Sequence, residues 1–469
     1  MSYLQPASRF GRREPAVSTA DAWPLDPSEN PRPVKAPELK VVALPKAPSS
    51  AIIALRTLCL TRLEPAAIAG MPSDQLIDDI ERLISEIATE RRMSLNAREQ
   101  RELAQDLVND ITGLGPLEPL LADDTINDIM VNGPQRIFVE RRGKVFLSNA
   151  RFRDTAHLIN VCQRIAAGVG RRIDESSPMV DARLKDGSRV NIVFPPLALD
   201  GPYVSIRKFG KKVMDFAQLV EFGALTPQVA NILGIASRAR LNIIISGGTG
   251  SGKTTLMNAL SQLIDVGERV VTVEDAAELQ LQQPHVVRLE TRPPNVEGKG
   301  EIAQRELVKN CLRMRPDRVI IGECRSGEAL DMLQAMNTGH EGSMTTIHAN
   351  TPRDALSRLE VMIAMAGFDI PTRGLRSQVS SALQIIVQAQ RLSGGKRKVT
   401  KVSEITGMEG EHITMQDLFA YEQTGVDSNG QAVGQFICTG IRPKCGERIE
   451  SRGMRFPGDL FMRRVMTAK

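Results

Sequence analysis

Aromatic residues are scarce in this sequence of 469 residues. They make up 4% of the chain, with one Trp and three Tyr. Proteins that bind single-stranded nucleic acid stack bases on aromatic side chains, so this composition disfavours that class of function. The formal net charge of +5 is mild. It suits acidic partners or anionic surfaces without requiring nucleic acid, and no nucleic-acid partner is expected.

Paired cysteines and long apolar runs are also missing. The six cysteines form no C-x-x-C pair, and no His stands at metal-ligand spacing from them. This pattern predicts reduced, mostly buried thiols in a reducing compartment. A run of about 18 apolar residues, which a membrane span needs, is absent. The first thirty residues also lack the apolar core of a signal peptide, so we expect a soluble, intracellular protein.

The N-terminal part of the chain changes character near residue 50. Residues 1–50 are rich in Pro, Ala and Ser without periodicity, which predicts a disordered tail. That tail is either an inert tether or a segment that binds a partner. Residues 51–112 predict a helical module, because apolar side chains from Leu76 to Ile87 recur at helical spacing.

The rest of the chain predicts two α/β domains and an extension. Residues 113–215 hold short alternating runs, and Asp186-Gly187 between two of them predicts a hairpin in a mixed α/β N-terminal domain. In residues 216–390 apolar strands alternate with helical stretches, which predicts a parallel sheet with crossover helices. Residues 391–469 predict a charged C-terminal extension of short strands and turns.

A glycine-rich stretch, GGTGSGKT, matches the pattern G-x-x-x-x-G-K-[ST] between an expected strand and an expected helix. The backbone N–H groups of such a loop close around phosphate oxygens, and the helix N-terminus adds its positive dipole end. Lys253 would bridge the β- and γ-phosphates, and the Thr254 hydroxyl would ligate Mg²⁺. The alternative is an ordinary glycine-rich turn. The predicted nucleotide-binding residues are Gly247, Gly248, Thr249, Gly250, Ser251, Gly252, Lys253, Thr254 and Thr255.

Acidic residues follow two of the expected strands. The stretch TVEDAAE places Glu274 and Asp275 at a strand end, where open α/β sheets bind ligands, unless it is only a solvated acidic turn. The apolar strand in RVIIGECR ends at Gly322, where most P-loop ATPases have an Asp that helps to hold magnesium. Glu323 is the next acid, and we expect it to position the attacking water. Glu274 and Asp275 would assist through magnesium-bound water. The predicted metal-site residues are Thr254, Asp275 and Glu323.

Histidine and arginine complete the list of candidates. The stretch TGHEGSMTTIHANTP holds His340 and His348, which we predict to sense the nucleotide; a lone His more often only packs. In VSIRKF, the spacing of Arg207 and Lys208 alone indicates no more than a surface charge pair.

Four blocks of this sequence resemble the Walker A, Asp box, Walker B and His box of the secretion-superfamily ATPases. They are GGTGSGKTT, VEDAAEL, MRPDRVIIGE and GSMTTIHANTP. Other stretches, among them RRIDESSPMVDARLKDGSRVNIVFPPLALDG and RLETRPPNVEGKGEI, are similar to the CpaF-type ATPase of tight-adherence (Flp) pilus assembly. The resemblance covers roughly residues 75–465 and is weak in the first fifty. Cys324 and Ser326 depart from the pattern of that branch, and neither is a proposed catalytic group.

The resemblance implies an α/β fold: a RecA-like P-loop NTPase domain preceded by a smaller α/β N-terminal domain. It implies a cytoplasmic homohexamer, peripheral at the inner face of the bacterial inner membrane, that binds ATP and Mg²⁺ between the two domains. Inner-membrane platform proteins would be its partners, with pilin moved indirectly. Arg207 would reach the phosphates, with Arg183 and Arg189 as weaker candidates. The four-cysteine zinc module of type II secretion ATPases is absent from the sequence, so no zinc is expected.

The predicted catalytic set is then Glu323, Lys253, Glu274, Arg207, His340 and His348. Within the superfamily, a type IV secretion ATPase for effector or DNA transfer is the alternative to Flp pilus assembly. Outside it stand a nucleic-acid translocase on the same core and a scaffold that binds ATP without turnover. The sparse aromatics count against the translocase. The intact carboxylates count against the scaffold.

Overall fold

The computed structural model describes residues 50–63, 71–141, 143–210, 213–295, 297–368 and 370–466. All of the predicted tail except Ser50 lies outside the described residues. The elements below belong to one compact unit, Val41–Lys469. None of its helices within the described ranges is both long enough and apolar enough to cross a bilayer.

Three helices form the segment predicted as a helical module, namely α1 (Ser50–Arg62), α3 (Ser73–Glu90) and α4 (Ala97–Thr112). Helix α4 begins at a capping box, in which Asn96 and Glu99 each accept the backbone N–H of the other. This arrangement satisfies two of the N–H groups that a helix start leaves unpaired. The predicted apolar face of α3 is confirmed, because it packs into a small core through Leu76, Ile80, Ile84 and Ile87.

An antiparallel sheet follows, with the strand order β3-β2-β1-β6-β5-β4. The predicted hairpin is confirmed: β4 pairs with β5 across a turn in which Gly187 has a φ of +92°. Few residues other than glycine adopt that backbone conformation. The strands are β1 (Ile126–Asn132), β2 (Ile137–Arg141), β3 (Lys144–Leu147), β4 (Met179–Arg183), β5 (Arg189–Val193) and β6 (Tyr203–Arg207), with helices α5 (Glu118–Ala122) and α6 (Thr155–Gly168).

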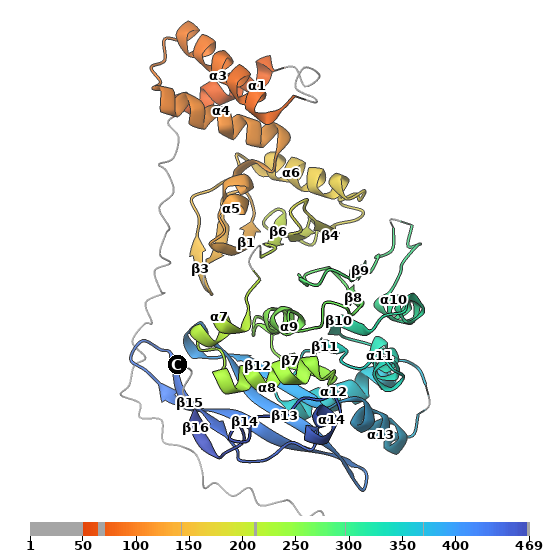
Figure 1. Cartoon of the computed structure of the whole chain (residues 1–469). Coiled ribbons are helices and arrows are strands. Elements are labelled where there is room, and N and C mark those ends of the chain that lie inside the picture. The colour runs from red at the N-terminus through yellow and green to blue at the C-terminus, as the bar shows by residue number, and fades with distance from the viewer. Residues whose placement is uncertain are drawn as a thin grey trace, which may run out of the picture. The chain divides into compact units, whose positions relative to one another are not determined.

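The second sheet contains the parallel strands that the sequence predicts, in the order β12-β7-β11-β10-β8-β9. Several neighbouring strands, such as β12 and β7 or β7 and β11, are not consecutive in the chain, and helices cross over between the parallel strands (Figure 1). This places the carboxyl ends of β7, β8, β10 and β11 at one edge. The strands are β7 (Ile243–Gly247), β8 (Val270–Glu274), β9 (Val286–Glu290), β10 (Arg318–Cys324), β11 (Met344–Ile347) and β12 (Ile385–Arg391).

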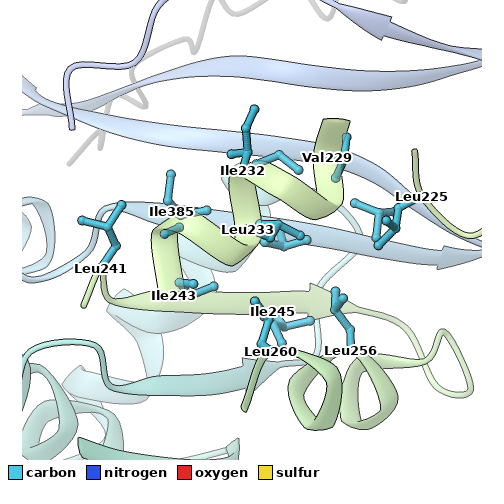
Figure 2. Packing of buried hydrophobic residues seen from close by; sticks show 14 of the residues in the cluster. Leu225, Val229, Ile232, Leu233, Leu241, Ile243, Ile245, Leu256, Leu260 and Ile385 are labelled. Carbon is cyan, nitrogen blue, oxygen red and sulfur yellow. The ribbon is translucent and has the colours of Figure 1, made fainter. Parts of the chain in front are cut away.

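Helices cover both faces of this sheet, because side chains alternate along each strand. Ile243 and Ile245 of β7 pack in one core with Leu233 of α8 and Leu260 of α9 (Figure 2). Ile244 points to the other core, with α11, α12 and α13. Each fully buried aliphatic side chain of this size stabilises the fold by roughly 1.5–3 kcal/mol. The helices are α7 (Phe216–Glu221), α8 (Pro227–Arg238), α9 (Lys253–Ser261), α10 (Gln304–Cys311), α11 (Glu328–Asn337), α12 (Pro352–Ala364) and α13 (Thr372–Ala382).

The C-terminal region differs from the prediction of short strands and turns. Strands β13 (Arg397–Glu409) and β14 (His412–Val426) contain 13 and 15 residues and extend the second sheet, with β13 antiparallel to β12 and β14 antiparallel to β13. Strands β15 (Ala432–Cys438) and β16 (Arg464–Met466) complete it, with α14 (Gly446–Glu450) between them. Antiparallel strands with one solvated face alternate buried apolar and exposed polar residues, so their charge content resembles that of a charged extension.

The predicted boundary at residue 390 falls inside β12, while the boundary at residue 112 coincides with the end of α4. The domain limits themselves stay predictions.

Candidate nucleotide site

The glycine-rich loop connects the carboxyl end of β7 to α9, as the sequence predicts. A Cβ atom on Gly247 would lie 2.3 Å from the Ala389 carbonyl oxygen of β12 and 2.5 Å from the Ser251 hydroxyl. At Gly252, the residue before the helix, φ is +96°. The first position therefore needs glycine for space, and the second needs it for its backbone conformation.

Lys253 is held by the loop itself. Its ammonium donates to the carbonyl oxygens of Gly247 (2.9 Å) and Gly248 (3.0 Å). Burial lowers the pKa of this amine, and the Glu323 carboxylate opposes that shift. Phosphate oxygens could replace the two carbonyl oxygens as acceptors, because an ammonium is a compact charge with three rotatable donors.

Glu274 ends β8 as a buried carboxyl group, with 3% of the residue exposed. Its Oε2 accepts the backbone N–H groups of Glu278 (2.7 Å) and Leu279 (3.0 Å). Burial raises the pKa of Glu274 to about 6, although those two N–H groups oppose the rise. The other oxygen, Oε1, is buried without a hydrogen-bond partner among the described residues. It is therefore available to a water or a ligand.

Glu323 and Asp275 share one cation, Arg325. The guanidinium donates to Glu323 through Nε (3.0 Å) and Nη2 (2.7 Å), and to Asp275 through Nη1 (3.1 Å). The backbone is fixed there as well, since Glu328 accepts the N–H groups of Arg325 (2.5 Å) and Ser326 (2.8 Å). The sequence pattern does not single out Arg325 as a functional residue. The only signal was a basic residue two positions after the candidate catalytic acid.

These residues fit a magnesium ion held mainly by phosphate and water. Mg²⁺ usually takes one or two protein ligands in nucleotide sites and keeps several waters. Thr254 lines the cavity beside the loop, and Glu274 offers its unpartnered oxygen. Asp275 and Glu323, predicted as metal-site residues, are engaged by Arg325 instead. Within the described ranges, no group of three or more His, Cys, Asp or Glu side chains is placed to hold a metal ion alone.

The structure separates the two histidines. His348 follows β11 at the loop, with its Nε2 3.4 Å from the Thr249 hydroxyl and its Nδ1 3.8 Å from Glu323. Burial and the nearby Lys253 charge lower the pKa of His348, which favours the neutral imidazole. His340 precedes β11, so it lies at the opposite edge of the sheet.

At that edge the backbone of His340 makes two hydrogen bonds. Its backbone N–H donates to Ala335 at the end of α11, and its carbonyl accepts the Ser343 hydroxyl (2.7 Å). No hydrogen bond or ion pair joins His340 to the glycine-rich loop within the described residues, so its predicted role in sensing nucleotide stays a prediction. The two histidines are close in the chain, but the four residues of β11, Met344 to Ile347, carry the backbone from one edge of the sheet to the other.

Arginines of the first sheet face the loop. Arg207 and Arg189 line one cavity together with Thr254 and Thr255 of α9. Arg207 is 52% exposed, and its Nε lies 3.6 Å from Asp128 on β1. A guanidinium with this much freedom can turn toward a phosphate.

The two weaker candidates are already paired. Arg189 donates to Glu278 (2.8 Å), while Arg183 donates to Glu290 (2.7 Å) and to the carbonyl of Ala277 (2.7 Å). These bonds connect the first sheet to the acidic turn after β8 and to the end of β9. Arg183 and Arg189 therefore stabilise that turn. Arg207 remains the best candidate among these arginines for binding a phosphate.

Comparison with known proteins places these features in context. A family model described as type II/IV secretion system protein matches residues 110–434. A putative conjugal transfer protein of Mycobacterium tuberculosis is 39% identical over 310 residues, which cover 65% of this chain and 88% of that protein. Conjugal transfer protein TrbB of Rhizobium radiobacter is 34% identical over 313 residues, 66% of this chain and 92% of that protein. Type IV secretion system protein VirB11 of Bartonella quintana is 29% identical over 328 residues, 62% of this chain and 92% of that protein.

Proposed function

We infer that this chain, which belongs to the type II/IV secretion system protein family and is an ATPase with a RecA-like domain, converts ATP hydrolysis into movement of its N-terminal domain. The observation that carries this proposal is the cavity lined by Arg189 and Arg207 from one sheet and by Thr254 and Thr255 beside the other. A phosphate bound there meets both sets of side chains. Loss of the γ-phosphate then removes an attraction between them.

The site supplies the parts that phosphoryl transfer needs. Glu323 positions the attacking water, and Glu274 offers a second carboxylate beside it. Lys253 holds the phosphates, and Arg207 stabilises the charge that grows in the transition state. Thr254 would hold Mg²⁺, which would neutralise phosphate charge when bound. Because this reaction needs positioning and electrostatic stabilisation more than covalent help, these side chains suffice.

We propose that the motor serves Flp (tight-adherence) pilus assembly. The support is the similarity of the stretches quoted above to the CpaF-type ATPase. On this proposal the chain forms a cytoplasmic homohexamer at the inner face of the bacterial inner membrane. Its direct partners are platform proteins of the pilus machine, and pilin is moved through them.

Type IV secretion is the second candidate, and the comparisons favour it at least as strongly. Two relatives that are 39% and 34% identical carry the name conjugal transfer protein. In that setting the same ATP-driven movement would power transfer of an effector or of DNA. The site residues and their chemistry are common to both candidates.

A deletion strain separates the two candidates. Wild-type chain and the inactive variant Lys253→Ala are each returned to the strain, and surface pili and plasmid transfer are both measured. Restoration of pili by the wild type alone supports the Flp proposal, whereas restoration of transfer alone supports type IV secretion. In parallel, the purified variant should show less than about a tenth of wild-type ATPase activity, because it loses a phosphate-bridging charge. Higher activity contradicts the assigned site.

Oligomeric state is tested separately. Native mass spectrometry with Mg²⁺ and a non-hydrolysable ATP analogue should show six copies. A stable monomer at micromolar concentration under those conditions would overturn the ring.

A further inference from the structure

Two arginines outside the predicted ATPase segment lie against the glycine-rich loop. They belong to the hairpin formed by β12 and β13, with Arg391 at the end of one strand and Arg397 at the start of the other. The Nε of Arg397 donates to the carbonyl oxygen of Gly250 (2.8 Å). A Cβ atom on Gly250 would lie 3.6 Å from Nη1 of Arg391, and one on Gly252 would lie 3.5 Å from Cδ of Arg397.

The bond to Gly250 has a consequence for the loop. In a trans peptide unit, the carbonyl group and the following N–H group point in opposite directions. A donor that fixes the Gly250 carbonyl therefore fixes the N–H of Ser251 on the other side of the loop. Gly250 has a φ of +68°, a conformation that the free loop holds weakly because glycine has many alternatives. An external hydrogen bond at this residue reduces that freedom before nucleotide arrives.

The same hairpin also contacts the first sheet. Arg391 donates through Nη2 to the carbonyl of Gly143 (2.8 Å), in the turn between β2 and β3. Asp128 of β1 lies close to Arg207 of the first sheet and to Arg397 of the hairpin. Burial raises the pKa of this carboxyl group, and the positive charges of Arg207 and Arg397 oppose the rise. One hairpin thus touches the phosphate loop with one arginine and the N-terminal sheet with the other.

We propose that Arg397 is a positioning residue for the phosphate loop, and that Arg391 couples the same hairpin to the N-terminal sheet. Arg397 holds the loop in the conformation that presents its N–H groups to phosphate. Arg391 transmits a change in the loop to the β2–β3 turn. This inference rests on the ATPase function proposed above and assigns the hairpin a role in it.

The first experiment measures the affinity of a fluorescent ATP analogue, together with kcat and KM, for Arg397→Ala, Arg397→Lys and Lys396→Ala. Lys396 is the matched control, because it is an exposed cation of the same hairpin whose side chain has no ion pair or hydrogen bond among the described residues. Arg397→Ala should weaken analogue binding and raise KM about tenfold, since a charged donor to a carbonyl is lost. The value of kcat should change less than threefold, and Arg397→Lys should recover part of the affinity.

The outcomes distinguish the inference from the function it rests on. Wild-type-like affinity of Arg397→Ala, or an equal loss in Lys396→Ala, overturns the positioning role while the ATPase assignment stands. Failure of the wild type itself to bind or hydrolyse ATP overturns the function instead. Thermal unfolding of each variant shows whether a loss of affinity is only a loss of fold.

The second experiment tests the coupling by amide hydrogen exchange. The segment 137–147, which contains the β2–β3 turn, should exchange at different rates with and without the ATP analogue in the wild type. With the analogue at a saturating concentration for each protein, Arg391→Ala should remove that difference, because the bond to the Gly143 carbonyl is lost. A nucleotide-dependent difference that survives in Arg391→Ala overturns the coupling role.

Discussion

The side chain of Glu274 occupies the space beside Gly322. A Cβ atom on Gly322 would lie 2.8 Å from Cγ of Glu274 and 3.4 Å from its Oε2. The two residues are neighbours because β10 pairs with β8 in parallel register, with Ile321 opposite Val273. An Asp at position 322 would therefore collide with Glu274. The usual Asp at the end of β10 cannot be accommodated, because the buried side chain of Glu274 on the neighbouring strand β8 fills its space.

Gly322→Ala tests this relationship. The added methyl group should displace Glu274 and lower ATPase turnover by about tenfold or more, since a misplaced acid loses its alignment. Overpacking of this kind costs roughly 1–3 kcal/mol of stability. The measurement is steady-state phosphate release together with thermal unfolding. Gly374→Ala in α13 is the control, because a Cβ there meets nothing within 4 Å; equal activities of the two variants would contradict the steric account.

Glu323→Gln should separate binding from chemistry. The substitution keeps the shape of the side chain and removes the charge that orients the attacking water. We expect near-normal affinity for a fluorescent ATP analogue and turnover that is lower by roughly a hundredfold or more, within the range for a positioned acid–base group. Turnover above half the wild-type rate would move the assignment to Glu274.

Arg325→Ala should change the dependence on magnesium. Without its guanidinium, Glu323 and Asp275 lose the cation that neutralises them both. The apparent affinity for Mg²⁺ in an ATPase titration should therefore rise, by roughly threefold or more, because uncompensated carboxylates attract a divalent cation. Arg325→Lys keeps the charge and should stay near wild type. An unchanged magnesium titration in Arg325→Ala would show that the arginine does not compete with the metal.

Arg207→Ala should lower turnover more than binding. A guanidinium near a transferring phosphoryl group stabilises charge that grows in the transition state. The loss in kcat should be about tenfold to a hundredfold, smaller than for a lone arginine finger, because other basic groups share the site. Arg136→Ala is the matched control, since Arg136 is an exposed arginine that pairs with Asp200 (3.3 Å). If kcat and affinity both stay at wild-type values, Arg207 is only a surface charge.

The pKa of Glu274 predicts an acidic limit to activity. The pKa is raised to about 6, so the carboxyl group is protonated as the pH falls through that value and can no longer organise magnesium-bound water. Because kcat/KM reports ionisation in the free enzyme, it should fall below pH of about 6, by up to tenfold per pH unit. Glu274→Gln should have lower activity, and its kcat/KM should not show this fall at acidic pH (the acidic limb of the pH profile). A limb that persists in the variant belongs to another group.

Much of the site could be predicted from local sequence pattern. The loop from Gly247 to Thr254 follows from glycine and lysine spacing between a strand and a helix. The positions of Glu274, Glu323 and His348 follow from strand ends, because parallel strands in one sheet present their carboxyl ends at one edge. These features need only short stretches of chain, whose backbone geometry their own residues determine.

The sequence by itself determined the phosphate loop, the parallel sheet and the acids at its edge. Only the tertiary structure decided which side chains meet there. The sharing of two acids by Arg325, the contact of Arg397 with Gly250 and the collision that requires Gly322 all depend on which strands pair and in what register. Strand pairing brings together residues that lie far apart in the chain, and burial of both faces of the sheet stabilises that pairing. No short stretch of sequence specifies which strands pair, because the free energy of apolar burial is gained only when the whole sheet assembles.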